Sequence, residues 1–324
     1  MPTQSPTKMP QAIQTMKAIR IHEYGGPDVL KYEDTPRPQP GAGEVLIRVH
    51  AAGVNPFDWK VREGYMKDML HWTLPMTPGW DVSGTVEATG PGVTRFKKGD
   101  AVYGNPSAAR NGAYAEFISV KESEITAKPA SLDHVHAAGV PVAASTAWQA
   151  IFDVAGLTSG QRILIHAASG GVGGSAVQLA KWKGAYVIGT ASQANLDYVR
   201  SLGADEVIDY RAQRFEEIVR DVDVVLDTLG GATQDKSWQV LKKGGVLVST
   251  VQPPNQEEAK RRGVRAQNMA NQSTADRLAQ IAQLIDAGRF KVNVETVLPL
   301  SEARKAQDLS QAGHTRGKIV LKVV

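Results

Sequence analysis

The residues best suited to chemistry begin with a glycine cluster inside RILIHAASGGVGGSAVQLAKWKGAYVIGTAS (residues 162–192). An apolar segment precedes the cluster and an amphipathic one follows it, which predicts a strand, a tight turn and a helix. A dinucleotide loop needs small residues there so that the chain can turn, approach the pyrophosphate and pack helix against strand. The phosphates then lie on the free N–H groups of the helix N-terminus. The stretch therefore predicts a dinucleotide-binding loop.

Two frames fit the required G-x-G-x-x-G spacing. Ala168, Gly170 and Gly173 match it with alanine in the first place, while Gly171, Gly173 and Ala176 match more loosely. A glycine-rich turn without a ligand has the same composition, but a strand before, a helix after and a second strand beyond favour the loop. The loop residues predicted to bind the cofactor are Ser169, Gly170, Gly171, Val172 and Gly173.

The end of the second predicted strand indicates which nicotinamide cofactor binds. NAD-dependent enzymes usually place an acid there to bond the ribose 2′-hydroxyl, whereas this chain has GTAS at residues 189–192. A 2′-phosphate meets no repulsion there and can accept a bond from Ser192. Tyr210 and Arg211, after the third strand, add a phenol and a positive charge, although Tyr210 is also explained as a strand-end aromatic. We therefore expect NADPH.

The elements that position these residues follow two patterns. The first third of the chain has short alternating segments separated by Gly and Pro, which is typical of a mostly antiparallel β domain. From about Ser131, short apolar strands alternate with amphipathic helices, which indicates a parallel sheet covered on both faces. The closing segments VNVETVLPL and GKIVLKVV lack further helix alternation, so we expect them to return to the β domain.

The predicted fold class is α/β, with a doubly wound parallel sheet of Rossmann type beside a β-barrel domain. We assign residues 16–135, completed by 290–324, to the β domain and residues 136–289 to the dinucleotide domain. Residues 1–15, MPTQSPTKMPQAIQT, lack an apolar signal-peptide centre and are predicted to be a flexible extension.

Composition argues against several function classes. The net charge is only +4, and no Lys/Arg block interleaves with aromatic residues, so we expect neither nucleic acid nor a membrane surface as a partner. No apolar run approaches the roughly 20 residues that span a bilayer. The chain has no cysteine, which rules out disulfides and thiolate zinc sites and fits a cytoplasmic location.

Motifs from Met16 to Val324 resemble the medium-chain dehydrogenase/reductase superfamily, in its zinc-independent quinone oxidoreductase (zeta-crystallin-like) branch. They are GVNPFDWKVREG (53–64), PGWDVSGTV (78–86), GAYAEF (112–117), STAWQA (145–150), HAASGGVG (166–173), LGADEVIDY, DVVLDTLGG, LKKGGVLVST and HTRGKIVL. The resemblance implies a GroES-like β domain beside a Rossmann domain, with the nicotinamide between them, and it favours a homodimer.

Zinc-dependent relatives have Cys where this chain has Asn55, and Gly-His-Glu where it has Gly79, Trp80 and Asp81. The four-cysteine structural zinc lobe is also missing, and the seven histidines show no i, i+4 pairing, so we expect no metal. Without a Lewis acid, alcohol oxidation lacks an activator. Hydride addition to a quinone or an α,β-unsaturated carbonyl compound is easier, because the electron sink is already conjugated.

The resemblance also assigns catalytic residues. Asn55 is expected near the nicotinamide and the substrate. Lys60, in an N-P-x-D-x-K-x-R pattern, either donates to the substrate oxygen or forms an ion pair, for example with Asp58. Tyr65 and Trp80 either line the pocket or belong to the core. Our predicted catalytic residues are Asn55, Lys60 and Tyr65.

Further cofactor contacts are predicted at the ends of strands and in the closing motif. Thr146 bonds the nicotinamide side or caps a helix, and Arg316 reaches the cofactor or forms a structural salt bridge. Relatives that bind the 2′-phosphate often have Lys where this chain has Asn195, so strict discrimination against NADH is not expected. The full predicted set outside the loop is Asn55, Thr146, Thr190, Ser192, Tyr210, Leu229, Val251, Arg316 and Lys318.

These patterns together predict an NADPH-dependent, zinc-independent reductase of quinones or enones. Two alternatives stay open at this point. One is a zinc-free alcohol or carbonyl dehydrogenase, and the other is a nucleotide-binding protein with little turnover.

Overall fold

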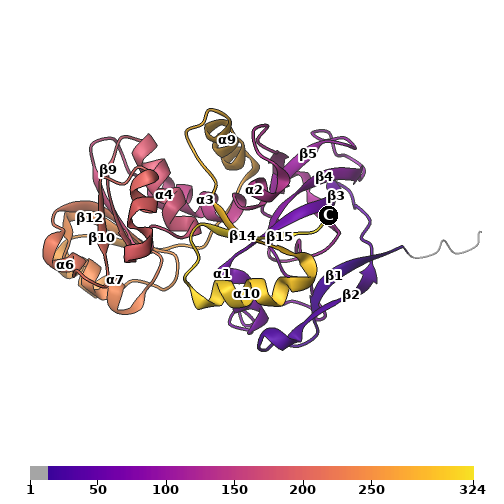
Figure 1. Ribbon diagram of the computed structural model, residues 1–324, viewed down its shortest axis with the longest axis horizontal. Helices are drawn as coiled ribbons and strands as arrows, with labels where there is room; N and C mark the ends of the chain where they lie inside the picture. The colour runs from indigo at the N-terminus through magenta and orange to yellow at the C-terminus, as the bar shows by residue number, and fades with distance from the viewer. Residues whose placement is uncertain (1–13) are drawn as a thin grey trace, which may run out of the picture.

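The computed structural model describes residues 14–324 and forms two lobes, each built around its own sheet (Figure 1). The dinucleotide lobe has a six-stranded parallel sheet in the order β10-β9-β8-β11-β12-β13. Its strands are β8 (Arg162–Ile165), β9 (Tyr186–Ala191), β10 (Glu206–Asp209), β11 (Val222–Asp227), β12 (Leu241–Ser249) and β13 (Arg265–Asn268). The strand order reverses between β8 and β11, which is where a doubly wound sheet binds its ligand.

Helices cover both faces of this sheet because alternate strand residues point to opposite sides. Ile163 and Ile165 pack in one core cluster with α3 (Pro141–Trp148), α4 (Gly171–Trp182) and α9 (Ala275–Asp286). Leu164 packs in the cluster on the other face with α6 (Phe215–Ile218) and α8 (Gln256–Arg262). Two further helices, α5 (Leu196–Ser201) and α7 (Gly231–Ser237), follow β9 and β11. The expected Rossmann architecture is confirmed.

Strand β13 was absent from the sequence prediction. Its four residues, RAQN, include no strongly apolar side chain, and three of them are exposed, so no alternation identifies them. Backbone pairing with β12 forms the strand instead. The loop helix also begins earlier than the predicted start at Gly173, because Gly171 already has helical geometry in α4.

The β lobe has a seven-stranded sheet in the order β14-β15-β3-β4-β5-β7, with β6 paired to β3. Its strands are β3 (Glu44–Val54), β4 (Asp81–Thr89), β5 (Ala101–Gly104), β6 (Phe117–Lys121), β7 (Ile125–Ala127), β14 (Val294–Pro299) and β15 (Lys318–Lys322). A hairpin of β1 (Thr15–Ile21) and β2 (Leu30–Pro36) lies beside it. The C-terminal strands and α10 (Ala303–Ala312) lie against the N-terminal third of the chain, as the yellow and indigo ribbons of Figure 1 show.

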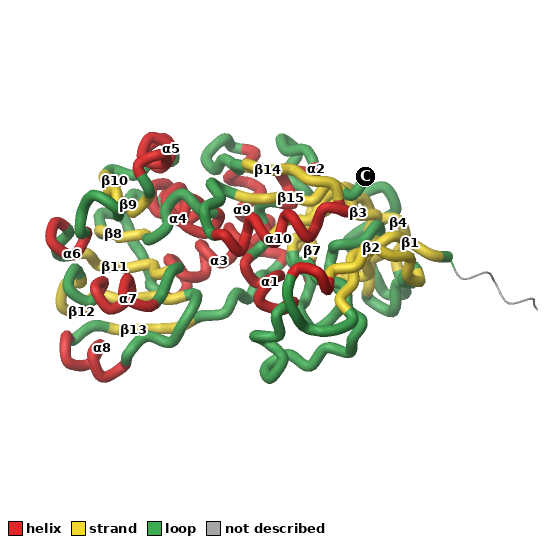
Figure 2. Tube along the Cα trace, turned by 60° about the horizontal axis from the view of Figure 1, so that its bottom comes forward, coloured by secondary structure: helices red, strands yellow, loops and turns green. Residues whose placement is uncertain are grey.

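The predicted N-terminal extension lies almost entirely outside the described residues. Strand β1 begins at Thr15, one residue before the predicted start, because Thr15 pairs with Pro36 of β2. Helix α2 (His134–Ala138) contacts β3, β4 and β15 and leads directly into α3, so it connects the two lobes (Figure 2).

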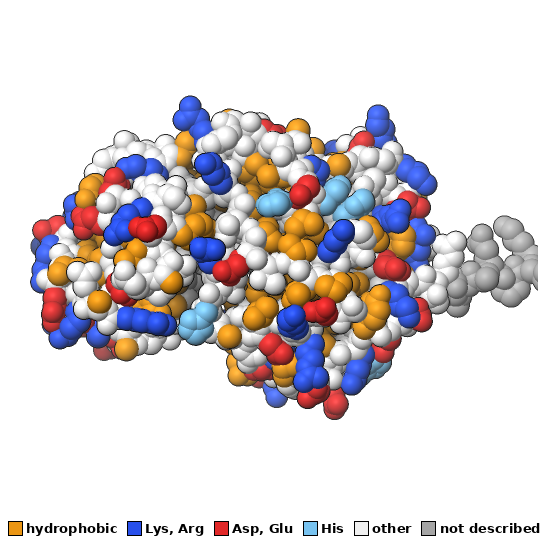
Figure 3. Space-filling view, viewed as in Figure 1, with side chains coloured by type: hydrophobic (Ala, Val, Ile, Leu, Met, Phe, Trp, Pro, Cys, Tyr) orange, Lys and Arg blue, Asp and Glu red, His pale blue; other side chains and the backbone are white. Residues whose placement is uncertain are grey.

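The outer surface has mixed charge. Lys/Arg and Asp/Glu side chains are interspersed on the face shown in Figure 3. Among residues 14–324, no helix combines the length and apolarity needed to cross a membrane.

One buried arginine joins α1 (Pro56–Arg62) to α10. Arg62 is fully buried and donates to the Gly25 carbonyl oxygen (3.2 Å), Gln307 Oε1 (3.0 Å) and Gln311 Oε1 (3.0 Å). Its charge is balanced by Glu63, with Nη2 2.7 Å from Oε1. This side chain therefore fixes the helix that follows Asn55 against the C-terminal part of the chain.

We expect Arg62→Met to lower the free energy of unfolding by about 3 kcal/mol or more, because it leaves buried acceptors and Glu63 without their donor. Urea denaturation measures the change. The matched control is Arg304→Met on α10, where Arg304 pairs with Asp28 and both side chains are largely exposed. Its expected cost is below about 1 kcal/mol. Equal losses in the two variants would contradict the structural role of Arg62.

Candidate active site

Three strand ends converge where the β lobe faces the glycine loop. Gly53 of β3 pairs with Asp81 of β4, and Val54 pairs with Ile319 of β15. Asn55 follows β3 and is the N-cap of α1, while Lys318 is the first residue of β15. The sheet register therefore brings Asn55, Asp81 and Lys318 together from three distant parts of the sequence.

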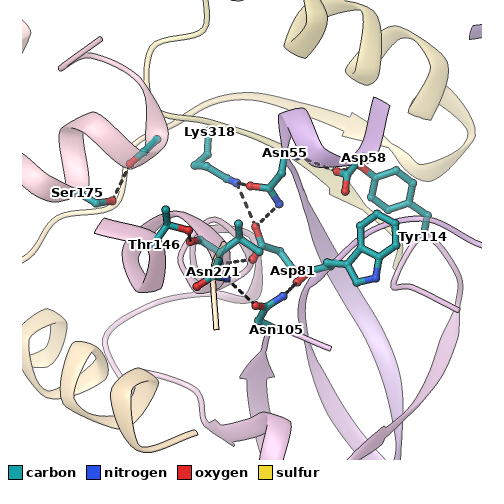
Figure 4. Close-up of polar contacts among 12 residues, drawn as sticks. Asn55, Asp58, Asp81, Asn105, Tyr114, Thr146, Ser175, Asn271 and Lys318 are labelled. Carbon is teal, nitrogen blue, oxygen red and sulfur yellow. Dashed lines mark hydrogen bonds and ion pairs between the residues drawn. The ribbon is translucent and has the colours of Figure 1, made fainter. Parts of the chain in front are cut away.

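These three side chains form a buried polar network (Figure 4). Lys318 Nζ donates to Asn55 Oδ1 (2.5 Å) and to Asp81 Oδ2 (3.1 Å), and Asn55 Nδ2 donates to Asp81 Oδ2 (2.9 Å). Lys318 and Asn55 are each 5% exposed, and Asp81 is fully buried. A buried ammonium is tolerated only with such a partner, so the Asp81 carboxylate is what keeps Lys318 in place.

The network also reaches the dinucleotide lobe. Asp81 Oδ1 accepts the Val142 N–H (2.6 Å) in the first turn of α3, and Thr146 Oγ1 donates to the Val142 carbonyl oxygen (2.7 Å). On the other side, the Gly317 N–H donates to the Ser169 carbonyl oxygen (2.8 Å). Asp81 and β15 therefore hold the β lobe against both α3 and the glycine loop.

The glycine loop makes close contacts that other residues would prevent. A Cβ on Gly173 would lie 2.2 Å from the Ala167 carbonyl oxygen, so this position needs glycine for α4 to pack against the end of β8. A Cβ on Gly171 would lie 2.9 Å from Lys318 Cδ, so the lysine side chain passes directly over the start of α4. The first N–H groups of a helix have no helical acceptors and favour an anion. The loop can thus hold a phosphate group beside Lys318.

Asp58 lies beneath this network and is also fully buried. Its Oδ2 accepts the Tyr114 hydroxyl (2.7 Å) and the Asn55 N–H (2.8 Å), while its Oδ1 has no partner among the described residues. Burial raises the pKa of Asp58 to about 7 against the opposing effect of these two hydrogen bonds. Asp58 therefore fixes Asn55 through its backbone and forms no ion pair with Lys60.

The other two predicted catalytic residues lie outside the network. Lys60 is half-buried, with Nζ 5.6 Å from the centroid of the Trp59 ring, and burial lowers its pKa. Tyr65 is 63% exposed and packs edge-on against Trp59 at 6.0 Å. A hydrogen bond to Glu63 raises the pKa of Tyr65, so its hydroxyl is engaged at the surface. The structure does not bring Tyr65 together with Asn55.

The predicted nucleotide contacts divide into buried and accessible residues. Thr190 is buried, and its Oγ1 lies 3.2 Å from His166 Nδ1. Its hydroxyl therefore bonds a residue inside the lobe and is not exposed for the predicted contact with the cofactor. Ser192 accepts a bond from Asn195 Nδ2 (3.3 Å), and the Tyr210 N–H donates to the Ala191 carbonyl oxygen (3.2 Å). Ser192 and Tyr210 are therefore neighbours at the carboxyl edge of the sheet, and the adjacent Asp209 is buried and accepts the Arg211 N–H (3.0 Å).

Three other predicted contacts are exposed. Leu229 and Val251 follow β11 and β12 and are 54% and 39% exposed. Arg316 lies with its guanidinium carbon 5.4 Å from the Tyr198 ring centroid and its Nε 3.9 Å from Glu295 Oε1. The predicted salt bridge and an approach to the cofactor are thus both compatible with the position of Arg316.

Sequence reasoning missed two parts of the site. Asp81 was considered only as a position where relatives have a metal ligand, although it accepts three hydrogen bonds here. The pair Asn105 and Asn271, joined across the lobes at 3.0 Å, was not identified at all. Both asparagines lie in loops, where no periodicity marks them.

Comparison with known proteins adds a family context to this geometry. Residues 41–130 match the family described as alcohol dehydrogenase GroES-like domain, and residues 202–321 match the family described as zinc-binding dehydrogenase. The mitochondrial NAD(P)H oxidoreductase RTN4IP1 of Mus musculus is 36% identical, over 95% of this chain and 89% of its own length.

Two further similarities come from a plant and a bacterium. The chloroplastic NADPH-dependent alkenal/one oxidoreductase of Arabidopsis thaliana is 36% identical, over 94% of this chain and 79% of its own length. The solved quinone oxidoreductase of Coxiella burnetii is 36% identical with a TM-score of 0.89, covering 96% of this chain and all of that one.

We expect Asp58→Asn to change how stability depends on pH. The folded chain holds the Asp58 proton up to a pKa of about 7, whereas an unfolded chain releases it near pH 4. The stabilisation is therefore present below about pH 4 and is lost as the pH rises through about 7. The neutral asparagine avoids this loss, so the melting temperature of the variant relative to the parent should rise from pH 5 to pH 8 in calorimetric scans.

The control for this experiment is Asp197→Asn. Asp197 has a fully exposed side chain in a surface pair with Arg200. Its variant should follow the parent at both pH values. A difference for Asp58→Asn that does not vary between pH 5 and pH 8 would contradict the raised pKa.

Proposed function

Since the chain belongs to the medium-chain dehydrogenase/reductase superfamily, in its quinone oxidoreductase branch, we propose that it is an NADPH-dependent reductase of quinones or α,β-unsaturated carbonyl compounds. That it is an oxidoreductase with a nicotinamide cofactor follows from the homologues themselves. The proposal adds the preference for NADPH, the class of acceptor and independence from zinc.

The observation that carries the proposal is the buried ammonium of Lys318 at the start of α4. Hydride addition to a conjugated carbonyl compound creates negative charge on its oxygen. An ammonium has three N–H donors, and two of those of Lys318 bond Asn55 and Asp81, which leaves the third for an incoming oxygen. A fixed donor in a site without water stabilises such an oxyanion strongly.

The residues at the lobe junction fit a nicotinamide dinucleotide. Gly171, Val172 and Gly173 offer their N–H groups to the pyrophosphate, and Leu229 and Val251 supply exposed apolar contacts at the sheet edge. Thr146 lies in the helix that carries Val142, beside Asp81. When bound, the reduced cofactor supplies two electrons and a proton as hydride. A second proton from water completes the reduction of a quinone to a hydroquinone or of an enone to a saturated ketone.

The preference for NADPH rests on the edge of the sheet near Ser192. No acid follows β9, and Ser192, Tyr210 and Arg211 come together there. Arg316 supplies a further positive charge near Tyr198. A 2′-phosphate can therefore accept hydrogen bonds from hydroxyl groups and pair with cations. The uncharged 2′-hydroxyl of NADH forms weaker interactions with the same residues.

The residues do not fit a catalytic zinc ion, although one matched family is described as zinc-binding. The oxygens of Asn55 and Asp81 already accept bonds from the Lys318 ammonium, which would repel a metal cation. Zinc prefers cysteine and histidine ligands, and this chain has no cysteine. Within residues 14–324, no group of three or more His, Cys, Asp or Glu side chains is placed to hold a metal ion.

We further propose that the chain forms a homodimer in the cytoplasm. Strand β13 is at the edge of the parallel sheet, with Arg265, Gln267 and Asn268 exposed. An edge strand offers unpaired backbone groups to a second chain. The lack of cysteine suits a reducing compartment.

We expect the purified protein to oxidise NADPH when a quinone or an enone is added, and Lys318→Met to lower kcat about 100-fold or more, because it removes the donor to the developing oxyanion. Absorbance at the nicotinamide band measures the rate. Lys60→Met tests the second candidate donor in parallel and should have a smaller effect. Tight NADPH binding without turnover across a broad acceptor panel would favour a nucleotide-binding protein, and oxidation of alcohols would favour the dehydrogenase alternative.

We expect NADPH to bind about tenfold more tightly than NADH, and a double change of Ser192→Ala and Tyr210→Phe to weaken NADPH binding alone. The lost bonds serve only the 2′-phosphate, so the Kd of NADH should stay within about twofold. Calorimetric titration of both cofactors gives the two constants. Equal affinities in the unmodified protein would overturn the preference.

A further inference from the structure

A buried carboxylate ends β11, and hydrogen-bond donors surround it. Asp227 is fully buried. Its Oδ1 accepts the N–H groups of Leu229 (3.0 Å) and Gly230 (2.8 Å). Its Oδ2 accepts Gln234 Nε2 (2.9 Å) and the Ser249 hydroxyl (2.9 Å). An ionised carboxylate offers about four acceptor positions, so these donors occupy all of them. Asp227 therefore joins the turn after β11, helix α7 and the end of β12.

The same carboxylate holds the turns that follow two neighbouring strands. Asp227 of β11 pairs with Ser249 of β12 in the parallel register. The turn after β12 is held through Ser249, whose Oγ accepts the N–H groups of Val251 and Gln252, both at 3.4 Å. The two turns also touch, since a Cβ on Gly230 would lie 2.9 Å from Gln252 Oε1. Asp227 thus fixes one turn directly and the other through a single hydroxyl.

Each of these turns exposes one large apolar side chain. Leu229 is 54% exposed and Val251 is 39% exposed, although the strand-end residues Asp227 and Ser249 are fully buried. The exposed pair lies at the carboxyl ends of adjacent parallel strands, which is the edge where a doubly wound sheet binds its ligand. Two aliphatic side chains there offer apolar contacts to a bound ligand.

The turn after β11 is also bonded to the strand end that leads into the glycine loop. The Thr228 hydroxyl donates to the His166 carbonyl oxygen (3.1 Å), and the His166 N–H donates to the Leu226 carbonyl oxygen (3.1 Å). His166 follows β8, which pairs with β11, and the glycine loop begins three residues later. Leu229 therefore lies beside the loop that is expected to hold the pyrophosphate, where the strand order reverses.

We propose that Asp227 is a positioning residue for the nicotinamide cofactor, because its carboxylate fixes Leu229 and Val251 as paired apolar contacts. This inference rests on the cofactor site proposed above and adds the group that holds two of its contacts in place. Neither side chain can bond a 2′-phosphate, so the contribution of Asp227 is the same for NADPH and NADH. The residues near Ser192 account separately for the preference between the two cofactors.

Asp227→Asn tests the proposal because it keeps the size of the side chain and leaves one oxygen, so two of the four donors lose their acceptor. The Kd values of NADPH and NADH should each rise about tenfold in calorimetric titrations, which is the effect of one hydrogen bond to a charged group. With NADPH at saturation, kcat for 1,4-naphthoquinone should stay within about twofold, as expected when binding is lost equally from ground state and transition state.

The matched control is Asp223→Asn at the opposite end of the same strand. Asp223 is also buried, accepts the Arg162 N–H (2.9 Å) and pairs with Lys242. Its variant loses a buried carboxylate from β11 but should leave both Kd values within about twofold of the parent. Equal rises in the Asp223 and Asp227 variants would indicate general loosening of the sheet and would overturn the proposal.

A second background tests whether Asp227 acts through the two apolar residues. In a Leu229→Ala and Val251→Ala protein, adding Asp227→Asn should change the Kd of NADPH less than about twofold, because the contacts that it fixes are already gone. A full tenfold change there would contradict the positioning role. Ser249→Ala is a milder variant that keeps Asp227 and cuts only its link to the Val251 turn, and it should raise both Kd values about threefold. This variant carries the test if Asp227→Asn does not fold.

These titrations need no turnover, so they separate this inference from the proposed function. If the parent protein reduces no acceptor yet the Kd values change as stated, the proposed function fails and the role of Asp227 stands. If the parent reduces quinones and Asp227→Asn binds both cofactors as the parent does, only the role of Asp227 is wrong.

Discussion

The buried ion pair of Lys318 and Asp81 is the interaction on which the rest of the structure depends. An ammonium without water is stable only if carboxylate and amide oxygens lie within hydrogen-bond distance. Because Lys318 is near the C-terminus and Asp81 is in the first third of the chain, the pair requires β15 beside β3 in one register. A slip of one residue would turn Lys318 to the opposite face of the sheet. The return of the chain end to the β lobe is therefore part of the site.

The same pair sets the distance between the lobes. Asp81 also accepts the Val142 N–H of α3, and the residue before Lys318 bonds the Ser169 carbonyl oxygen of the glycine loop. Both lobes are thus fastened to one carboxylate and one strand end. Hydride transfer needs reacting atoms about 3–3.5 Å apart, and a junction fixed at two points is what such an approach requires.

The fold could be predicted from the sequence wherever its pattern was local. The apolar pattern of strands such as RILI and the glycine cluster at the start of α4 predict the dinucleotide lobe. The resemblance to the family predicts the GroES-like architecture of the β lobe. Strand β13 could not be predicted, since its polar residues are held by pairing with β12. In the site, Asn55 and Lys318 were identified by resemblance. The contacts of Asp81 and Asn271 depend on register and on loop paths, which no residue spacing reveals.

A tethered ammonium has different consequences from a metal ion at the same place. A Lewis acid lowers the pKa of a bound alcohol and so assists oxidation as well as reduction. An ammonium does this weakly, but it stabilises an oxygen that becomes negative during reduction. Its strength depends on the exclusion of water, which the burial of Lys318, Asn55 and Asp81 provides. For the proposed acceptors, conjugation spreads the developing negative charge over several atoms, so less stabilisation is asked of the lysine than for an isolated ketone.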